Sequence, residues 1–120
     1  MKKVLTVDDA AFIRLTLRNI LEKLDYVEVH EAASGSEALH KYKELKPDLV
    51  TMDITMSDMT GIEALKRIRE FDEKAKIIII SALGEESMVK EAVLAGAISF
   101  IVKPFREEYV FNTAKKVLGI

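Results

Sequence analysis

Short apolar stretches alternate along the chain with longer segments in which apolar residues recur at helical spacing. The clearest stretch is Ile77–Ile80, an unbroken isoleucine run that is typical of a strand buried on both faces of a parallel sheet. The clearest helical segment has leucine or isoleucine at positions 17, 20, 21 and 24, which places them on one helix face. The predicted strands are Val4–Val7, Val27–His30, Leu49–Met52, Ile77–Ile80 and Phe100–Val102.

The helical segments between these strands carry recognisable ends. Ser34–Glu37 and Thr60–Glu63 each place a hydroxyl residue three positions before a glutamate, which is the capping-box spacing. A shorter helix over Val89–Val93 is expected to end near Gly96, a residue type that suits a helix C′ position. The last helix should run through Val110–Leu118. Strands and helices thus alternate five times, which predicts an α/β protein with a parallel sheet covered on both faces.

Composition narrows the class of protein. The chain has 120 residues, 49% hydrophobic and 32% charged, with a net charge of −2, which fits one soluble globular domain over residues 1–120. It has no cysteine, so disulfides and thiolate metal sites are excluded. The absence of cysteine is also consistent with a protein of a reducing compartment. The basic residues are not clustered as in a nucleic-acid-binding surface. The chain also shows no signal peptide and no apolar run long enough to span a membrane. We therefore expect a cytoplasmic protein that binds neither nucleic acid nor membrane.

Chemically reactive side chains follow several of the predicted strands. Asp8 and Asp9 follow the first strand, Asp53 the third, Ser81 the fourth and Lys103 the fifth. The carboxyl ends of parallel strands share one edge of the sheet, where α/β proteins bind ligands. Taken singly, each residue has an ordinary alternative role: a helix N-cap for either of the first two aspartates, a solvated strand terminus for Asp53, a turn former for Ser81, and a surface charge for Lys103. Their occurrence together at strand ends favours one shared site.

Three carboxylates in one crevice need a cation. Two carboxylates about 4 Å apart repel by about 4 kcal/mol at an intermediate dielectric. Mg²⁺ binds through carboxylates, waters and phosphate oxygens, and its charge together with that of Lys103 would cancel the three carboxylates. His30 and His40 fall outside this set, so a softer metal such as zinc is not expected. A carboxylate beside Mg²⁺, an ammonium and a hydroxyl is equipped to attack phosphorus, and Asp53 is the predicted nucleophile.

This set of residues resembles that of bacterial response-regulator receiver domains, and the resemblance extends over the whole chain. The matching positions are Asp8-Asp9, Asp53, Ser81 and Lys103-Pro104. The resemblance implies a single-domain, doubly wound (βα)5 flavodoxin-like fold with a five-stranded parallel sheet in the order 2-1-3-4-5. It also implies a signalling switch rather than an enzyme, with Asp53 accepting a phosphoryl group from a histidine kinase.

The resemblance further assigns roles to individual residues. Asp9 would bind Mg²⁺ directly, Asp8 through water, and Asp53 and the backbone carbonyl of Thr55 would complete the protein ligands. Lys103 and Ser81 would contact the phosphoryl oxygens, and the peptide bond from Lys103 to Pro104 would be cis. Phe100 matches the aromatic switch position, which turns inward when the Ser81 hydroxyl engages phosphate. The alternative for Phe100 is a plain core aromatic.

Within the family, the segments DDAAFIR, TMDITMSDMTG and FIVKPF look most like stand-alone chemotaxis regulators. Output would then be binding, through a surface over roughly Met88–Leu118 that phosphorylation remodels. The expected output partner is a flagellar motor switch protein, a phosphatase is a further candidate partner, and the expected state is a monomer. Ser57 replaces a usual proline, and Ile98-Ser99 replaces a commonly charged pair, which leaves the identity of the output partner open.

Three other readings compete with this one. A stand-alone phosphorelay receiver would share every site residue and differ only in its partner. A small phosphohydrolase with an aspartyl nucleophile usually has a second acid two residues after the nucleophile, where this chain has Thr55. A flavin-binding electron carrier would need a phosphate cradle after the first strand, where Asp8 and Asp9 would repel a phosphate.

Overall fold

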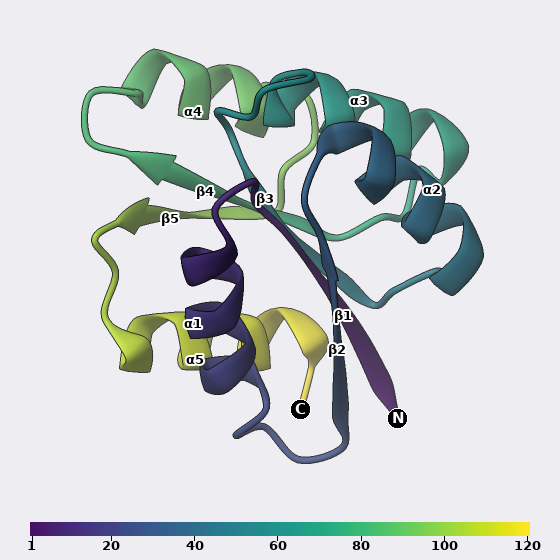
Figure 1. Cartoon of the computed structure of the whole chain (residues 1–120), viewed down its shortest axis with the longest axis vertical. Coiled ribbons are helices and arrows are strands. Elements are labelled where there is room, and N and C mark those ends of the chain that lie inside the picture. The colour runs from purple at the N-terminus through teal and green to yellow at the C-terminus, as the bar shows by residue number, and fades with distance from the viewer.

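Five parallel strands form one sheet in the order β2-β1-β3-β4-β5 (Figure 1). The computed structural model describes all residues from Met1 to Ile120. The strands are β1 Lys2–Val7, β2 Val27–Ala32, β3 Leu49–Asp53, β4 Ile77–Ala82 and β5 Ser99–Lys103. The helices are α1 Ala11–Leu21, α2 Gly35–Leu45, α3 Gly61–Phe71, α4 Glu86–Leu94 and α5 Glu107–Leu118. The predicted fold class and strand order are confirmed, and each strand extends slightly beyond its predicted apolar run.

Helices cover the sheet in two layers, with α1 and α5 on one face and α2, α3 and α4 on the other (Figure 1). Successive side chains of a strand point to opposite faces, and the isoleucine run of β4 follows that rule. Ile77 and Ile79 pack in the core under α2, α3 and α4, whereas Ile78 and Ile80 pack in the core under α1 and α5. The prediction of a strand buried on both faces is confirmed.

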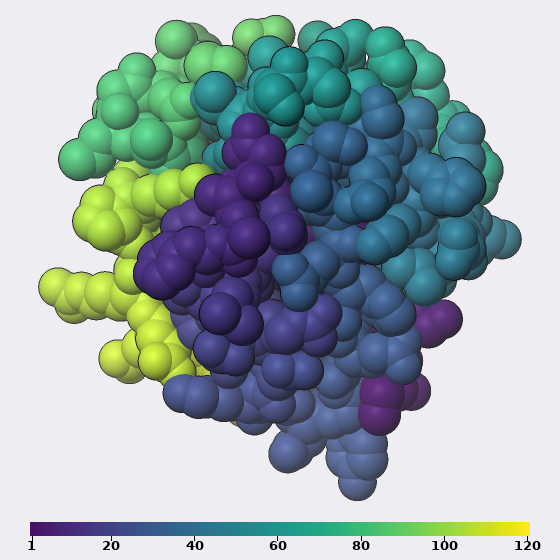
Figure 2. All heavy atoms as spheres, in the orientation of Figure 1, coloured from purple at the N-terminus to yellow at the C-terminus, as the bar shows by residue number.

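The space-filling view shows how the layers meet at the surface. Atoms of α1, in dark purple, occupy the centre of the visible face, with yellow-green residues of the C-terminal part on one side and blue residues of α2 on the other (Figure 2). The contacts between α1 and α5 agree with this picture. No helix combines the length and apolar composition needed to cross a membrane.

The predicted helix ends are mostly correct. Ser34 Oγ accepts the Glu37 N–H at 3.1 Å, and the Glu37 carboxylate accepts the N–H of Ala33 at 2.6 Å. Thr60 likewise caps α3 by accepting the Glu63 N–H at 3.2 Å, but the Glu63 carboxylate pairs with an arginine one turn on. The second capping box is therefore only half formed.

Two other helix ends bear on the predictions. Gly96 follows α4 with a φ of +114°, a conformation that L side chains rarely adopt, so its predicted place after the helix is confirmed. The first helix ends at Leu21 rather than continuing to Leu24. Leu24 still packs in the core beneath α1, because the turn after the helix keeps it on the same side.

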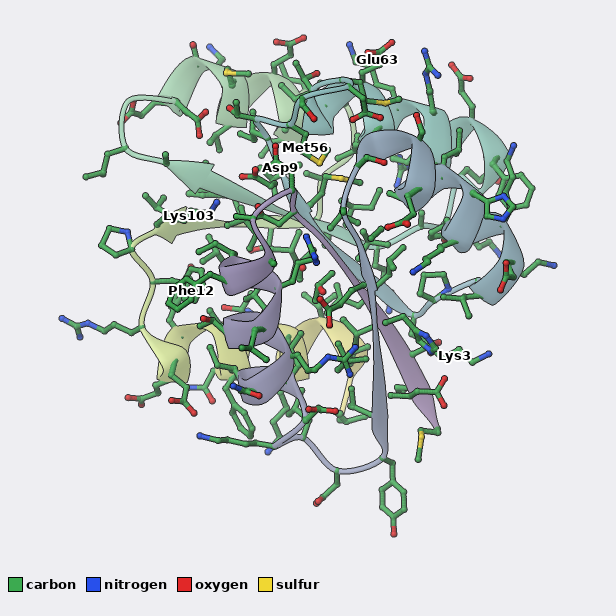
Figure 3. The ribbon with its side chains drawn as sticks, in the orientation of Figure 1. Lys3, Asp9, Phe12, Met56, Glu63 and Lys103 are labelled. Carbon is green, nitrogen blue, oxygen red and sulfur yellow. The ribbon has the colours of Figure 1, made fainter.

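The carboxyl ends of the strands share one end of the sheet. Figure 3 shows Asp9 and Met56 near that end of β1 and β3 with Lys103 beside them, whereas Lys3 lies toward the opposite end of the molecule. We use "carboxyl end" and "amino end" for these two poles of the sheet.

Candidate functional site

Three carboxylates meet at the carboxyl end. Asp8 and Asp9 follow β1, and Asp53 is the last residue of β3. The two strands are neighbours, with Val7 paired to Met52, so their ends lie side by side. One oxygen from each carboxylate lies within 4.8 Å of the others. The structure therefore brings together the three acids that the sequence singled out.

Lys103 reaches this cluster from the edge of the sheet. It ends β5, which pairs with β4 rather than with β3, and its side chain extends across β4. Lys103 Nζ donates to Asp53 Oδ1 at 3.1 Å and to Asp8 Oδ2 at 3.2 Å. Burial lowers the pKa of Lys103, but its hydrogen bond to Asp53 and its attraction to both carboxylates raise that pKa overall. The alternative role of a surface charge is therefore wrong.

Asp53 is buried and poorly neutralised. Burial and repulsion from Asp8 raise the pKa of Asp53 to about 6, although its contacts with Lys103 act in the opposite direction. Only 7% of the residue is exposed, so the alternative of a solvated strand terminus is wrong. One ammonium group does not offset three carboxylates, and the site favours a further cation.

The two aspartates after β1 have different surroundings. Asp8 is buried, and its oxygens accept hydrogen bonds from the Ala10 N–H at 2.8 Å and from Lys103. Asp9 is exposed, and its carboxylate makes no hydrogen bond within the protein. Neither aspartate is the N-cap of α1, because Ala10 occupies that position; the N-cap alternative is wrong. Asp9 is thus the freer of the two to bind a metal directly.

Ser81 lies on β4, and Phe100 lies on the neighbouring edge strand β5. Ser81 is 1% exposed inside a strand, so it is not a turn former, and its Oγ has no hydrogen-bond partner. Phe100 is 43% exposed, so the alternative of a plain core aromatic is wrong. Both residues line one groove of about 430 Å³ between β5 and α4. The bond between Lys103 and Pro104 is cis, as the resemblance implied.

A glycine sets the position of Asp53. The Gly61 N–H donates to the Ile54 carbonyl at 2.6 Å, which brings the start of α3 against the end of β3. A Cβ at position 61 would collide with the backbone carbonyl oxygen of Asp53. A glycine is required at this position because α3 begins in backbone contact with the candidate nucleophile.

Two acidic residues of this end were not singled out from the sequence. Asp58 accepts hydrogen bonds from the N–H groups of Ser36 and Gly35 at 2.9 and 3.0 Å and from the Ser36 hydroxyl at 2.9 Å. These bonds, with that from the Ser36 N–H first, lower the pKa of Asp58 to about 2. The Glu85 carboxylate accepts hydrogen bonds from the Thr55 hydroxyl and from the Ala82 N–H. Both acids join segments that are distant in the sequence, so no local signal identifies them.

The donor set suits a hard divalent cation. All three acids offer carboxylate oxygens, the kind of ligand that Mg²⁺ prefers. The nitrogen ligands of softer metals are elsewhere, since His30 pairs with Glu28 and His40 lies near Glu44. Burial and repulsion from Asp8 raise the pKa of Asp53, so a bound cation would favour its ionised form. The residues present therefore fit Mg²⁺, as the sequence predicted.

This sheet order, with acids after β1 and at the end of β3 and a lysine at the end of β5, defines a class of protein. A family model described as the response regulator receiver domain matches residues 4–115. The chain belongs to this family, the receiver domains of two-component signalling systems, and the predicted resemblance is confirmed. Family membership contradicts the phosphohydrolase and flavin-carrier alternatives.

Comparison with individual relatives indicates which members of the family the chain is similar to. The chain is 55% identical over 116 residues to chemotaxis protein CheY of Thermotoga maritima, covering 97% of each protein. It is 52% identical over 117 residues to chemotaxis protein CheY of Bacillus subtilis, covering 98% of each. Its structure is similar to that of Vibrio cholerae chemotaxis protein CheY4, with a TM-score of 0.88, 33% identity and 98% coverage of both chains. The chain therefore resembles regulators of chemotaxis.

Proposed function

We propose that residues 1–120 form one receiver domain in which Asp53 accepts a phosphoryl group from a phosphohistidine of a histidine kinase. The observation that carries this proposal is the buried Asp53 carboxylate between two further aspartates and Lys103 Nζ. The chain then acts as a switch. It catalyses only its own phosphorylation and dephosphorylation and acts on no separate substrate.

The chemical step is an in-line displacement at phosphorus. Lys103 engages Oδ1 of Asp53, and Oδ2 accepts no hydrogen bond from the protein, so Oδ2 is available as the nucleophile. The new oxygen–phosphorus bond forms as the nitrogen–phosphorus bond of the donor breaks, and the electron pair of that bond returns to the imidazole, which takes up a proton. Above pH 6, the pKa of Asp53 keeps the attacking carboxylate ionised.

The side chains around Asp53 have separate tasks in this step. The Lys103 ammonium offsets negative charge that accumulates on the phosphoryl oxygens, and the Ser81 hydroxyl, which has no partner, can donate to one of them. Asp9, Asp8, Asp53 and the Thr55 carbonyl would hold Mg²⁺. The bound ion would supply further neutralisation of the same oxygens.

The groove between α4 and β5 supports a binding output. Its apolar lining includes Val89, Val93, Phe100 and Val102, and it reaches Ser81 at the phosphorylation site. Movement of Ser81 toward a phosphoryl group would leave room for Phe100 to turn inward and change the shape of the groove. Because the similar relatives are chemotaxis proteins, the proposed output partner is a flagellar motor switch protein.

Phosphoryl labelling tests the proposal. The protein is incubated with Mg²⁺ and acetyl phosphate, and intact-mass and peptide mass spectrometry locate any added phosphoryl group. We expect labelling of Asp53 in the wild type, none in Asp53→Asn, and unchanged labelling in Asp25→Asn, an exposed aspartate outside the site. Labelling that persists in Asp53→Asn would place the acceptor elsewhere.

A binding measurement tests the output. The wild type and Asp53→Asn are titrated with a purified flagellar motor switch protein, with and without acetyl phosphate. We expect the donor to tighten binding of the wild type alone. Equal binding with and without phosphorylation would argue against a motor-switch output and favour a different partner, as in a phosphorelay.

A further inference from the structure

Glu85 joins the two segments that flank the phosphorylation site. It stands at the start of α4, where its Oε1 accepts the Ala82 N–H at 2.5 Å and its Oε2 accepts the Thr55 hydroxyl at 2.8 Å. Thr55 comes two residues after Asp53, and Ala82 directly follows Ser81. One half-buried carboxylate therefore bridges the segment after β3 and the segment after β4.

We propose that Glu85 is a positioning residue whose carboxylate holds these two segments together in the unphosphorylated chain and is displaced when Asp53 is phosphorylated. This role rests on the proposed function, because it requires a phosphoryl group on Asp53. The bridge is then a contact of the resting state that phosphorylation must break.

Charge supplies the reason for displacement. The site already holds three carboxylates and one ammonium, and a phosphoryl group adds a charge of roughly −2 with three strong acceptor oxygens. The Glu85 carboxylate is bound to the residue two positions after the acceptor, so the added charge repels it. The phosphoryl oxygens also compete with Glu85 for the same kind of donors, an N–H and a hydroxyl.

Release of Glu85 would affect the output groove because residues just before Glu85 in the chain line that groove. Ala82 and Leu83, which precede Glu85, line the groove together with Ser81 and Phe100. Leu83 is 76% exposed, so little packing holds this part of the segment beyond the bridge. Loss of the bridge therefore frees the rim of the groove at Leu83, while Ala82 stays paired with Lys103 in the sheet.

The neighbouring Glu86 offers a matched control. It carries the same charge one residue further along, but its only side-chain hydrogen bond, at 3.4 Å, is to the N–H of Gly84, within its own segment. Glu85→Gln and Glu86→Gln therefore remove equal charge, and only Glu85→Gln weakens the bridge between the two segments. Thermal melts would establish that both variants are folded.

The experiment compares the initial rates of Asp53 labelling by acetyl phosphate with Mg²⁺. We expect Glu85→Gln to label about two- to fivefold faster than wild type, the effect of removing one partly exposed like charge and its competing bonds, and Glu86→Gln to label at nearly the wild-type rate. Equal rates in the two variants, or slower labelling in Glu85→Gln, would overturn the displacement. Absence of label on Asp53 in the wild type would instead overturn the proposed function.

A second measurement follows Glu85 in the wild-type protein. In wild-type protein with ¹³C-labelled glutamate, we expect the side-chain carboxyl resonance of Glu85 to shift when Asp53 is phosphorylated, and to shift further than that of Glu86, which lines the groove but makes no bond to Thr55 or Ala82. The Glu85→Gln and Glu86→Gln variants serve to assign the two resonances. A Glu85 resonance that does not move while Asp53 is fully labelled would show that the bridge survives phosphorylation.

Discussion

Asp53 at the carboxyl end of the sheet and Asp72 at the amino end are held in opposite electrostatic states. At the carboxyl end, burial and the neighbouring Asp8 raise the pKa of Asp53 to about 6. At the amino end, Asp72 accepts a hydrogen bond from the buried Tyr42 hydroxyl at 2.8 Å, and this bond, first among several contacts, lowers the pKa of Asp72. One carboxylate is destabilised by its surroundings, and the other is stabilised by them.

The difference between the two ends indicates that the amino end contributes to stability and the carboxyl end to function. Polar groups at the amino end have partners within the protein: Lys3 N–H donates to Asp48 at 2.8 Å, and Lys76 Nζ donates to the Val117 carbonyl at 3.3 Å. At the carboxyl end, the Ser81 hydroxyl has no partner and the acids outnumber the available cation. Groups left unsatisfied at one place are typical of a site that is completed by a ligand or a chemical modification.

The largest change in stability should come from a substitution at the amino end. Tyr42 is 2% exposed, and Tyr42→Ala should lower the free energy of unfolding by about 3–5 kcal/mol because it leaves a cavity and removes the hydrogen bond to Asp72. Urea denaturation measures this loss, with Tyr109→Ala, an exposed tyrosine of α5, as the control. Phosphoryl labelling of the folded variant should stay at the wild-type rate. A matching fall in labelling would show that the two ends are not independent.

Asp53→Asn should raise the free energy of unfolding, whereas Tyr42→Ala lowers it. The pKa of Asp53 is raised from 3.8 in the unfolded chain to about 6 in the folded one. The folded chain therefore holds more protons between these values, stability falls as pH rises through that window, and the penalty is complete above it. Without Mg²⁺ at pH 7.5, we expect the variant to be about 1–3 kcal/mol more stable than wild type.

The pH dependence of the gain in stability of Asp53→Asn tests whether charge is its cause. In urea denaturation at a series of pH values, the gain should shrink as pH falls through 6 and vanish below 3.8, where Asp53 is protonated in both states. A gain that is constant with pH would mean that side-chain shape, not charge, is responsible.

Mg²⁺ should stabilise the wild type through the carboxyl end alone. At a free concentration tenfold above Kd, preferential binding to the folded state should add about 1.4 kcal/mol. Thermal melts with a Mg²⁺ titration measure the shift, which should be smaller in Asp53→Asn and unchanged in Tyr42→Phe. An equal shift in all three proteins would place the ion outside the acidic cluster.

The smallest effect should come from the hydroxyl of Tyr42. Tyr42→Phe keeps the ring, which packs edge-on against Phe71 at 6.3 Å, and removes only the hydrogen bond to Asp72. We expect a loss of about 1 kcal/mol in urea denaturation. Tyr26→Phe, at an exposed tyrosine, should show no loss. Because the bonded Asp72 has a lowered pKa, the loss should fade as pH falls and that acid is protonated.

Local patterns were sufficient for the elements of the fold. The alternation of Ile77–Ile80 between two cores and the cap of Ser34 on α2 follow from side-chain periodicity and from hydrogen bonds over three residues. The ends of helices were harder, since Leu24 keeps the helical spacing but lies beyond α1. Apolar spacing continues wherever the same side is buried, whether or not the backbone stays helical.

The sequence by itself determined which chemical groups stand at the strand ends, because parallel strands bring their carboxyl ends to one edge whatever the loops do. Only the tertiary structure decided how those groups are held. Lys103 meets Asp53 from 50 residues away, and Glu85 meets Thr55 from 30 residues away. Such contacts depend on the placement of whole segments against each other, as do the opposite pKa directions of Asp53 and Asp72, since burial and neighbouring charge exist only once the chain has folded.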